Sequence, residues 1–209
     1  MAITVWNTTW YVEAGTVSVV TTSHTVASWS DGILIVAVPE SRASDVTAVT
    51  YNWVSLTLAT SNAVWLNRAY LYYLVNPPVW TYTISVTFST SLADHIVTAI
   101  NLYWVDQSSP IWATNSISGT TQNKSISLTT TRANSYLIEC FWDQWVTNTP
   151  ASGQTYILNG ANRSSAYSTT TTAGSYTRNW TGNTSLSYSM VIAEIKEAAT
   201  SSSNFLMFF

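Results

Sequence analysis

The sequence predicts an all-β protein, a single jelly-roll-like antiparallel sandwich of roughly a dozen strands. Short runs rich in Thr, Val, Ile and Tyr recur along the chain, with turn residues about every 8–12 positions. One long run, residues 80–88, alternates strictly between apolar and polar side chains. No segment of helical length shows a 3.6-residue apolar period, and only residues 194–199 favour helix locally.

The stretch at residues 70–88 organises this prediction. Its second half places Tyr82, Ile84, Val86 and Phe88 on one face and hydroxyl side chains on the other, as in a strand with one buried face. The segment Asn76-Pro77-Pro78 interrupts the apolar run before it, as a turn does. The pattern therefore predicts a long β-hairpin over residues 70–88.

The remaining strands follow in chain order. Residues 3–5 and 16–22 come first, and the apolar run 33–38 predicts a strand buried on both faces. Asn52-Trp53 separates two β-type runs, which predicts a two-residue hairpin turn. Further strands are predicted at residues 46–51, 54–58, 96–103, 126–130, 135–141, 154–158, 166–172, 176–180 and 187–195.

Residues 1–197 are expected to form this sandwich domain, and residues 198–209 a Ser-rich linker with an apolar tail. Leaving an apolar side chain in water costs roughly 1.5–3 kcal/mol. Such a tail either folds back onto its own sandwich or docks into a neighbouring subunit. We interpret it as a subunit contact made by Phe205, Leu206, Met207, Phe208 and Phe209.

The composition of the chain indicates which classes of partner it is expected to bind. Apolar residues make up 46% of the chain, charged residues only 8%, and the formal net charge is −3. A nucleic-acid partner would call for a basic surface. Little charge favours self-association, so copies of the chain are the expected partners, with other virion or cell-surface proteins or glycans besides. No membrane span or secretory signal is visible, and the expected location is a virion or the extracellular space.

No catalytic pattern is present, so the sequence predicts no enzyme and no catalytic, cofactor-binding or metal-binding residues. The histidines, His24 and His95 of Asp94-His95, stand without a G-x-S-x-G nucleophile elbow. Cys140 lies in an apolar run and is interpreted as a buried core residue.

Metal binding has equally little support. Two histidines and one cysteine, far apart, make no zinc pattern. Ca²⁺ is the one alternative considered, because loop carboxylates can join backbone carbonyls around it. The loop carboxylates are Asp31, Asp45, Asp106 and Asp143. No Asp-rich loop is present, so no cofactor is expected.

Several motifs resemble a widespread family of uncharacterised β-sandwich structural proteins from bacterial and phage genomes. These motifs are SHTV…ILIVAV, VTYNWVSLT, YLVNPPVWTYTISVTFS, YWVDQSSPIWAT and MVIAEIK, and the resemblance covers residues 1–197. It implies a jelly-roll-like sandwich, no enzymatic activity and no site residues.

The chain departs from this family by carrying Trp where the familiar pattern has Gly. The positions are Trp10, Trp29, Trp53, Trp65, Trp80, Trp104, Trp112, Trp142 and Trp145, whereas Trp180 looks at home. The clearest five are Trp29, Trp53, Trp80, Trp104 and Trp112. Eleven Trp beside seven Gly is also inverted for a turn-rich protein. One genetic code reads UGA as glycine and others read it as tryptophan, which would produce this substitution. If so, turn or positive-φ backbone is expected at several of these tryptophans.

These observations predict a non-enzymatic structural protein that assembles with copies of itself on a virion surface, as decoration or fibre, or in an extracellular filament. The alternative is a glycan-binding adhesin or lectin-like module. In that case Trp53, Trp80 and Trp112, at predicted loops, would form flat platforms for sugar rings.

Overall fold

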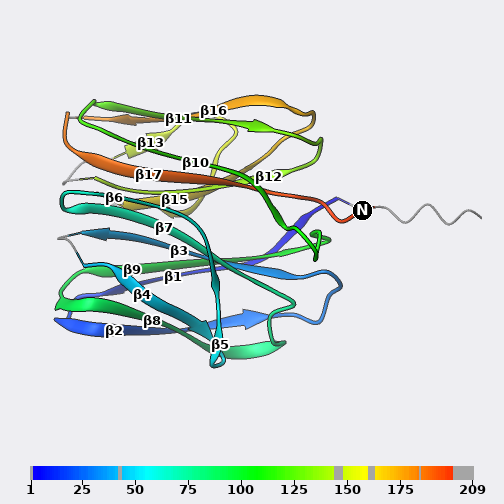
Figure 1. The fold of residues 1–209 in the computed structure, drawn as a ribbon, viewed down its shortest axis with the longest axis horizontal. Coiled ribbons are helices and arrows are strands. Elements are labelled where there is room, and N and C mark those ends of the chain that lie inside the picture. The colour runs from blue at the N-terminus through cyan, green and yellow to red at the C-terminus, as the bar shows by residue number, and fades with distance from the viewer. Residues whose placement is uncertain (1, 42–43, 144–147, 160–162, 184, 200–209) are drawn as a thin grey trace, which may run out of the picture.

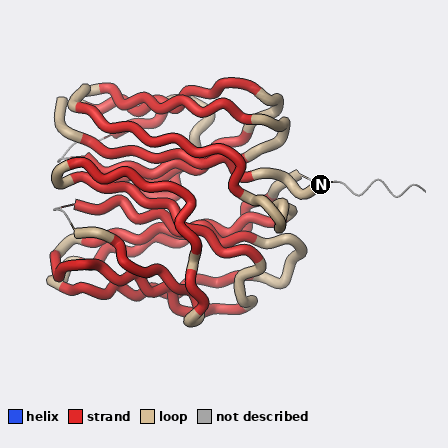
Figure 2. Tube along the Cα trace, viewed as in Figure 1, coloured by secondary structure: helices blue, strands red, loops and turns tan. Residues whose placement is uncertain are grey.

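The computed structural model describes residues 2–41, 44–143, 148–159, 163–183 and 185–199. This part of the chain contains strands and no helix, so the all-β prediction is confirmed (Figure 2). The described residues form seventeen strands, whereas the sequence predicted a single sandwich of about a dozen. They are β1 Thr4–Glu13, β2 Val17–Val26, β3 Ile33–Ser41, β4 Val46–Tyr51, β5 Val54–Ser55, β6 Thr57–Val64, β7 Asn67–Val75, β8 Trp80–Leu92, β9 His95–Tyr103, β10 Ile111–Gly119, β11 Asn123–Thr130, β12 Tyr136–Asp143, β13 Asn148–Pro150, β14 Thr155–Asn159, β15 Arg163–Thr169, β16 Gly174–Gly182 and β17 Tyr188–Ile195.

The strands form four antiparallel sheets stacked as layers (Figure 1). The outer sheet β2-β8-β4-β5 packs on β1-β9-β3-β7-β6, and these two make the first sandwich. The sheet β10-β17-β12-β15-β14 packs on the outer sheet β11-β16-β13, and these make the second. A third core joins the two middle sheets, so the sandwiches share one apolar interface.

The two sandwiches have the same strand order. Replacing β1, β9, β3, β7 and β6 by β10, β17, β12, β15 and β14 converts one middle sheet into the other. In the same way β2-β8-β4 corresponds to β11-β16-β13, and only β5 has no counterpart. The second half of the chain therefore repeats the topology of the first.

The apolar run of β3 is confirmed as a strand buried on both faces, because it lies in the middle of the stack. Leu34, Val36 and Val38 face the first sandwich core. Ile33, Ile35 and Ala37 face the core between the two sandwiches. Alternate side chains of a strand point to opposite faces, so a strand between two cores must be apolar throughout.

The alternation predicted for residues 80–88 is confirmed, but the hairpin over residues 70–88 is wrong. Ile84, Val86 and Phe88 are buried, and the hydroxyl residues between them face outward. However, β7 pairs with β3 and β6, whereas β8 pairs with β2 and β4. The Asn76-Pro77-Pro78 segment therefore carries the chain from one sheet to the other. Proline has no backbone N–H to donate to a neighbouring strand, and a connection between sheets does not need one.

Candidate functional site

Strand β1 is an edge strand of the first sandwich. It pairs with β9 along one edge, and no other described strand pairs with it. Its outward face carries Trp6, Trp10 and Val12, all exposed, with Thr8 between them. Its only charged residue is Glu13, at its end. Apart from an irregularity at Trp6, an unpaired edge therefore runs along β1 beside apolar side chains, with little charge to repel a partner strand.

An aromatic group lies at the start of this edge. The ring centroids of Trp6 and Trp29 are 5.8 Å apart, and those of Trp29 and Tyr103 are 5.9 Å apart. Tyr103 is buried and its hydroxyl donates to the carbonyl of Ala27 at 3.0 Å. The half-exposed indole of Trp29 thus packs on a buried, hydrogen-bonded tyrosine of the sandwich.

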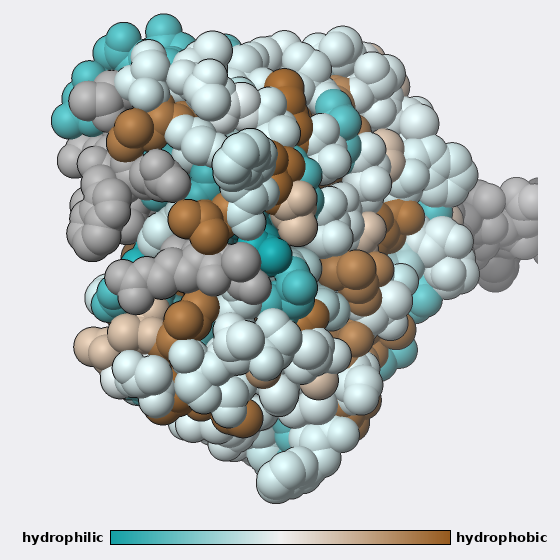
Figure 3. All heavy atoms as spheres, turned by 60° about the vertical axis from the view of Figure 1, so that its left-hand side comes forward, coloured by the Kyte–Doolittle hydropathy of each residue, from teal (hydrophilic) through white to brown (hydrophobic). Residues whose placement is uncertain are grey.

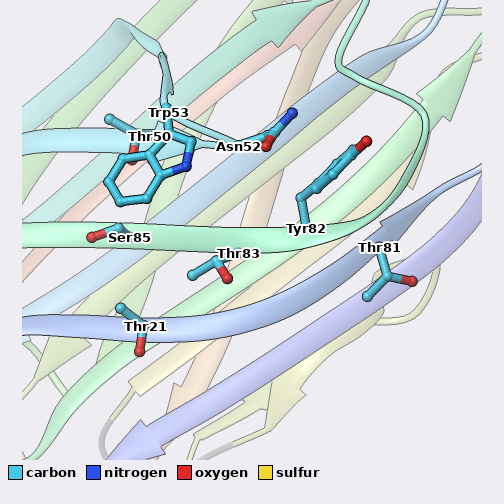
Figure 4. Close-up of a pocket in the computed structure, with 8 residues that line it drawn as sticks. All are labelled: Thr21, Thr50, Asn52, Trp53, Thr81, Tyr82, Thr83 and Ser85. Atoms are coloured by element: carbon cyan, nitrogen blue, oxygen red, sulfur yellow. The ribbon is translucent and has the colours of Figure 1, made fainter.

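A groove of about 520 Å³ lies on the outer sheet of the first sandwich (Figure 4). Its walls are Trp53 and Tyr82, with Asn52 between the two rings and Thr83 below them in the view. The other lining residues carry hydroxyls: Thr21, Thr50, Thr81 and Ser85. Two rings and a floor of hydroxyls would suit an uncharged polar ligand such as a sugar.

The three tryptophans proposed as a sugar platform are not brought together. Of the three, only Trp53 is among the residues described as lining the groove. Trp80 is exposed at the start of β8, and Trp112 belongs to β10 in the second sandwich. The ammonium of Lys196 lies 4.5 Å from the Trp112 ring centroid, so this indole already has a cationic partner.

The histidines and the cysteine are internal, so no open site gathers around them. His95 is fully buried, with Nδ1 2.6 Å from Glu40 Oε2, and its ring stacks on Phe88. Burial alone would lower the pKa of His95, but the hydrogen bond and the charge of Glu40 outweigh it and raise this pKa. His24 is buried between Thr9 and Asn101. Burial raises the pKa of Cys140, which packs in the core between the sandwiches.

Three of the four carboxylates considered for Ca²⁺ are engaged by cations, and one of these, Asp143, ends strand β12 and does not lie in a loop as expected. Asp45 lies 2.6 Å from Arg68, Asp106 lies 2.9 Å from Lys196, and Asp143 lies 2.8 Å from Lys124. Within the described residues no group of three or more His, Cys, Asp or Glu side chains could hold a metal ion. The described residues also include no helix that is both long and apolar enough to cross a membrane.

Four tryptophans have the backbone that the sequence predicted for glycine positions. Trp53, Trp65, Trp80 and Trp104 have φ values of 66°, 54°, 94° and 63°. The other non-glycine residues with positive φ in the described chain are all Asp or Asn, the types that tolerate this region: Asp31, Asn52, Asn76, Asp94 and Asn134. A bulky residue there is an outlier, so tryptophan is the unexpected member of this set.

Trp29 and Trp112 do not have positive φ, and Trp29 lies in the connection between β2 and β3. Trp112 instead lies at a β-bulge of β10. Trp142 is buried, with the Arg163 guanidinium 4.3 Å from its ring centroid, and Trp10 lies on the exposed face of β1. Trp145 and the apolar tail 205–209 lie outside the described residues.

Comparison with protein-family models, with curated proteins and with solved structures finds no match to this chain in any of the three. The expected relationship to a family of structural proteins therefore rests on the sequence motifs alone. What the structure confirms is coarser, namely an all-β protein of several antiparallel sheets.

Proposed function

We propose that this chain is a non-enzymatic structural protein that assembles with copies of itself, on a virion surface or in an extracellular filament. The observation that supports this best is the open edge of β1. Proteins that stay apart usually protect such an edge with charge, proline or a covering segment. Here the outward face of the edge offers Trp6, Trp10 and Val12, and a second copy could pair with the backbone beside them.

The composition of the surface fits the same role. The face shown in Figure 3 is mostly pale, with scattered apolar and hydrophilic residues. Only 8% of the chain is charged, so adjacent copies would meet little electrostatic repulsion.

Each sandwich is also proposed to be a jelly roll. In the first, the strands of one sheet run in the order β1-β9-β3-β7 and those of the other in the order β2-β8-β4. The second sandwich repeats this order. Jelly rolls occur in viral capsid proteins and in lectins, so the architecture agrees with both functions considered and does not choose between them.

A charge placed on the β1 edge tests the assembly. Thr8→Lys puts an ammonium between Trp6 and Trp10 on the exposed face, and we expect about tenfold weaker self-association. Thr181→Lys is the matched control, because Thr181 is an exposed hydroxyl residue of β16 that is paired with Asn123 of β11 on one side and Thr149 of β13 on the other. Sedimentation of the full chain over a range of concentrations measures both variants. A monomeric wild type, or equal association by the Thr8 variant, would refute the proposal.

The apolar tail at 205–209 is proposed to strengthen the same assembly by docking on a neighbouring subunit. Burying three of its side chains would contribute several kcal/mol, roughly the scale of a stable contact. Deleting residues 203–209 should leave a folded chain with weaker association by sedimentation. Unchanged association would refute a role of the tail in assembly, and the proposal for the β1 edge would stand.

The groove beside Trp53 supports glycan binding as the second candidate function. A glycan array with the full chain, repeated with Trp53→Ala and Tyr82→Ala, tests it. Specific binding that both variants lose, in a protein that stays monomeric, would favour the lectin-like function over assembly.

A further inference from the structure

The turns of the first sandwich place tryptophan where hairpin geometry requires glycine. Asn52 and Trp53 join the paired residues Tyr51 and Val54, and both turn residues have positive φ, 47° and 66°. This is the pattern of a type I′ turn, for which Asn-Gly is strongly preferred. Trp53 therefore occupies the glycine position of an Asn-Gly turn.

The next hairpin turn repeats the observation. Trp65 and Leu66 join the paired residues Val64 and Asn67. Trp65 alone has positive φ, at 54°, which matches the first central position of a type II′ turn. Glycine is the residue found at that position. Trp80, the first residue of β8, has a φ of 94°, also in the region that glycine favours.

The second sandwich carries glycine at the places that correspond to Trp80 and Trp65. Trp80 opens β8 in the sequence WTYT, and Gly174 opens the equivalent β16 in the sequence GSYT, so the two match in strand position and sequence although Gly174 does not have positive φ. Trp65 follows β6 in WLNR, and Gly160 follows the equivalent β14 in GANR. Gly160 itself lies outside the described residues, so this correspondence rests on sequence and strand order. Trp53 has no direct counterpart, because its turn leads into β5, which the second sandwich lacks; its assignment rests on the turn geometry alone.

No packing compensates for the strained backbone at these positions. The exposed fractions of Trp53, Trp65 and Trp80 are 92%, 86% and 73%. In contrast, Trp180 is fully buried and packs against Phe141 and Tyr156. A tryptophan kept for its large apolar area would resemble Trp180.

We infer that the chain is a tandem duplication of one sandwich unit, and that positions 53, 65 and 80 are glycine in the molecule made by its source. The groove would then lose the indole wall of Trp53, and the outer sheet would present an open hydroxyl face. The aromatic platform of the glycan-binding alternative would disappear. Assembly through the β1 edge does not depend on these three residues, so the two proposals can fail separately.

The coding sequence and the mass of the native protein test this inference directly. We expect UGA codons at positions 53, 65 and 80 and a UGG codon at position 180. The intact mass of protein isolated from its source should be lower than the written sequence by at least three tryptophan-to-glycine differences. UGG codons at the three positions, or a mass equal to that of the written sequence, would overturn it.

Variants of the full chain as written test the backbone argument. Trp53→Gly, Trp65→Gly and Trp80→Gly should each raise the midpoint of thermal unfolding by about 2–4 °C, because glycine relieves the left-handed strain. Trp53→Ala is the matched control: it removes the same exposed indole but keeps a Cβ at positive φ, so it should not reproduce the gain. Equal midpoints for Trp53→Ala and Trp53→Gly, or no gain in any glycine variant, would contradict the assignment of these positions.

Discussion

The two sandwiches share one strand order, but they have different residues in their turns and different ionic partners for their buried carboxylates. In the first, Trp80 opens β8 where Gly174 opens the equivalent β16, and the Asn52-Trp53 turn leads into β5, which the second lacks. Each also buries a carboxylate near the end of an equivalent strand: Glu40 in β3 beside a histidine, and Asp143 in β12 beside a lysine. The comparison teaches which features the topology requires. A tight turn requires a backbone conformation, and a buried carboxylate requires a cation, whichever residue supplies it.

The largest expected effect contrasts two tryptophans. Trp180→Gly removes a fully buried indole from the second sandwich and should lower the free energy of unfolding by at least about 3–5 kcal/mol. Trp80→Gly removes an exposed indole at positive φ and should raise it by about 1 kcal/mol. Urea unfolding of both variants measures the difference. Similar losses in both would mean that Trp80 contributes to packing and is not a glycine position.

The buried ion pairs give the next effect. Asp143→Asn leaves the fully buried Lys124 without its carboxylate and should cost about 3 kcal/mol. Glu40→Gln should cost about 1 kcal/mol, because a neutral imidazole of His95 can still hydrogen-bond to the amide that replaces the carboxylate. Equal costs at neutral pH would show that the two pairs are electrostatically alike.

Such pairs lie beyond what the sequence could predict, and the reason is topological. The alternation at residues 80–88 and the apolar run of β3 report burial directly, and both were predicted. Local pattern does not name a strand's partner, so the Pro77-Pro78 crossover was mistaken for a hairpin turn. Strand β10 was missed because its residues are mostly exposed and do not alternate.

The candidate site shows the same limit. A strand was predicted at residues 3–5, but its length and its open edge depend on which strands pair with it. The Asn52-Trp53 turn was predicted from two residues, because a turn is local. The duplication is visible in WLNR and GANR only after the strand orders have been aligned.

A pH titration gives a smaller effect, centred on the second sandwich. Glu139 is buried in β12, and burial raises the pKa of its carboxyl to about 8. The folded chain therefore keeps a proton that the unfolded chain releases above about pH 4.5. Stability should fall as the pH rises, by about 2–3 kcal/mol between about pH 5 and about pH 7.

His95 in the first sandwich has a raised pKa and contributes a fall of the same sign, since its stabilisation is present below the unfolded pKa and is lost as the pH rises through the folded one. Glu139→Gln should remove most of the slope, and His95→Gln a smaller part, in denaturant unfolding at a series of pH values. An unchanged slope in the Glu139 variant would show that its carboxyl is ionised in the folded chain.

The smallest expected effect distinguishes the two arguments for glycine, which are positive φ and the correspondence between the two sandwiches. Trp104 has a φ of 63°, but the position after the equivalent strand β17 is Lys196, which does not have positive φ. Backbone strain alone therefore predicts that Trp104→Gly gains about 1 kcal/mol, without support from the repeat. Trp112→Gly is the matched comparison, because Trp112 is also partly exposed but lacks positive φ and contacts Lys196. Glycine there should lose about 1 kcal/mol through weaker strand propensity and the lost cation–π contact. If both variants gain stability in the same urea titration, exposure of the indole is what destabilises the chain, and backbone conformation is not the cause.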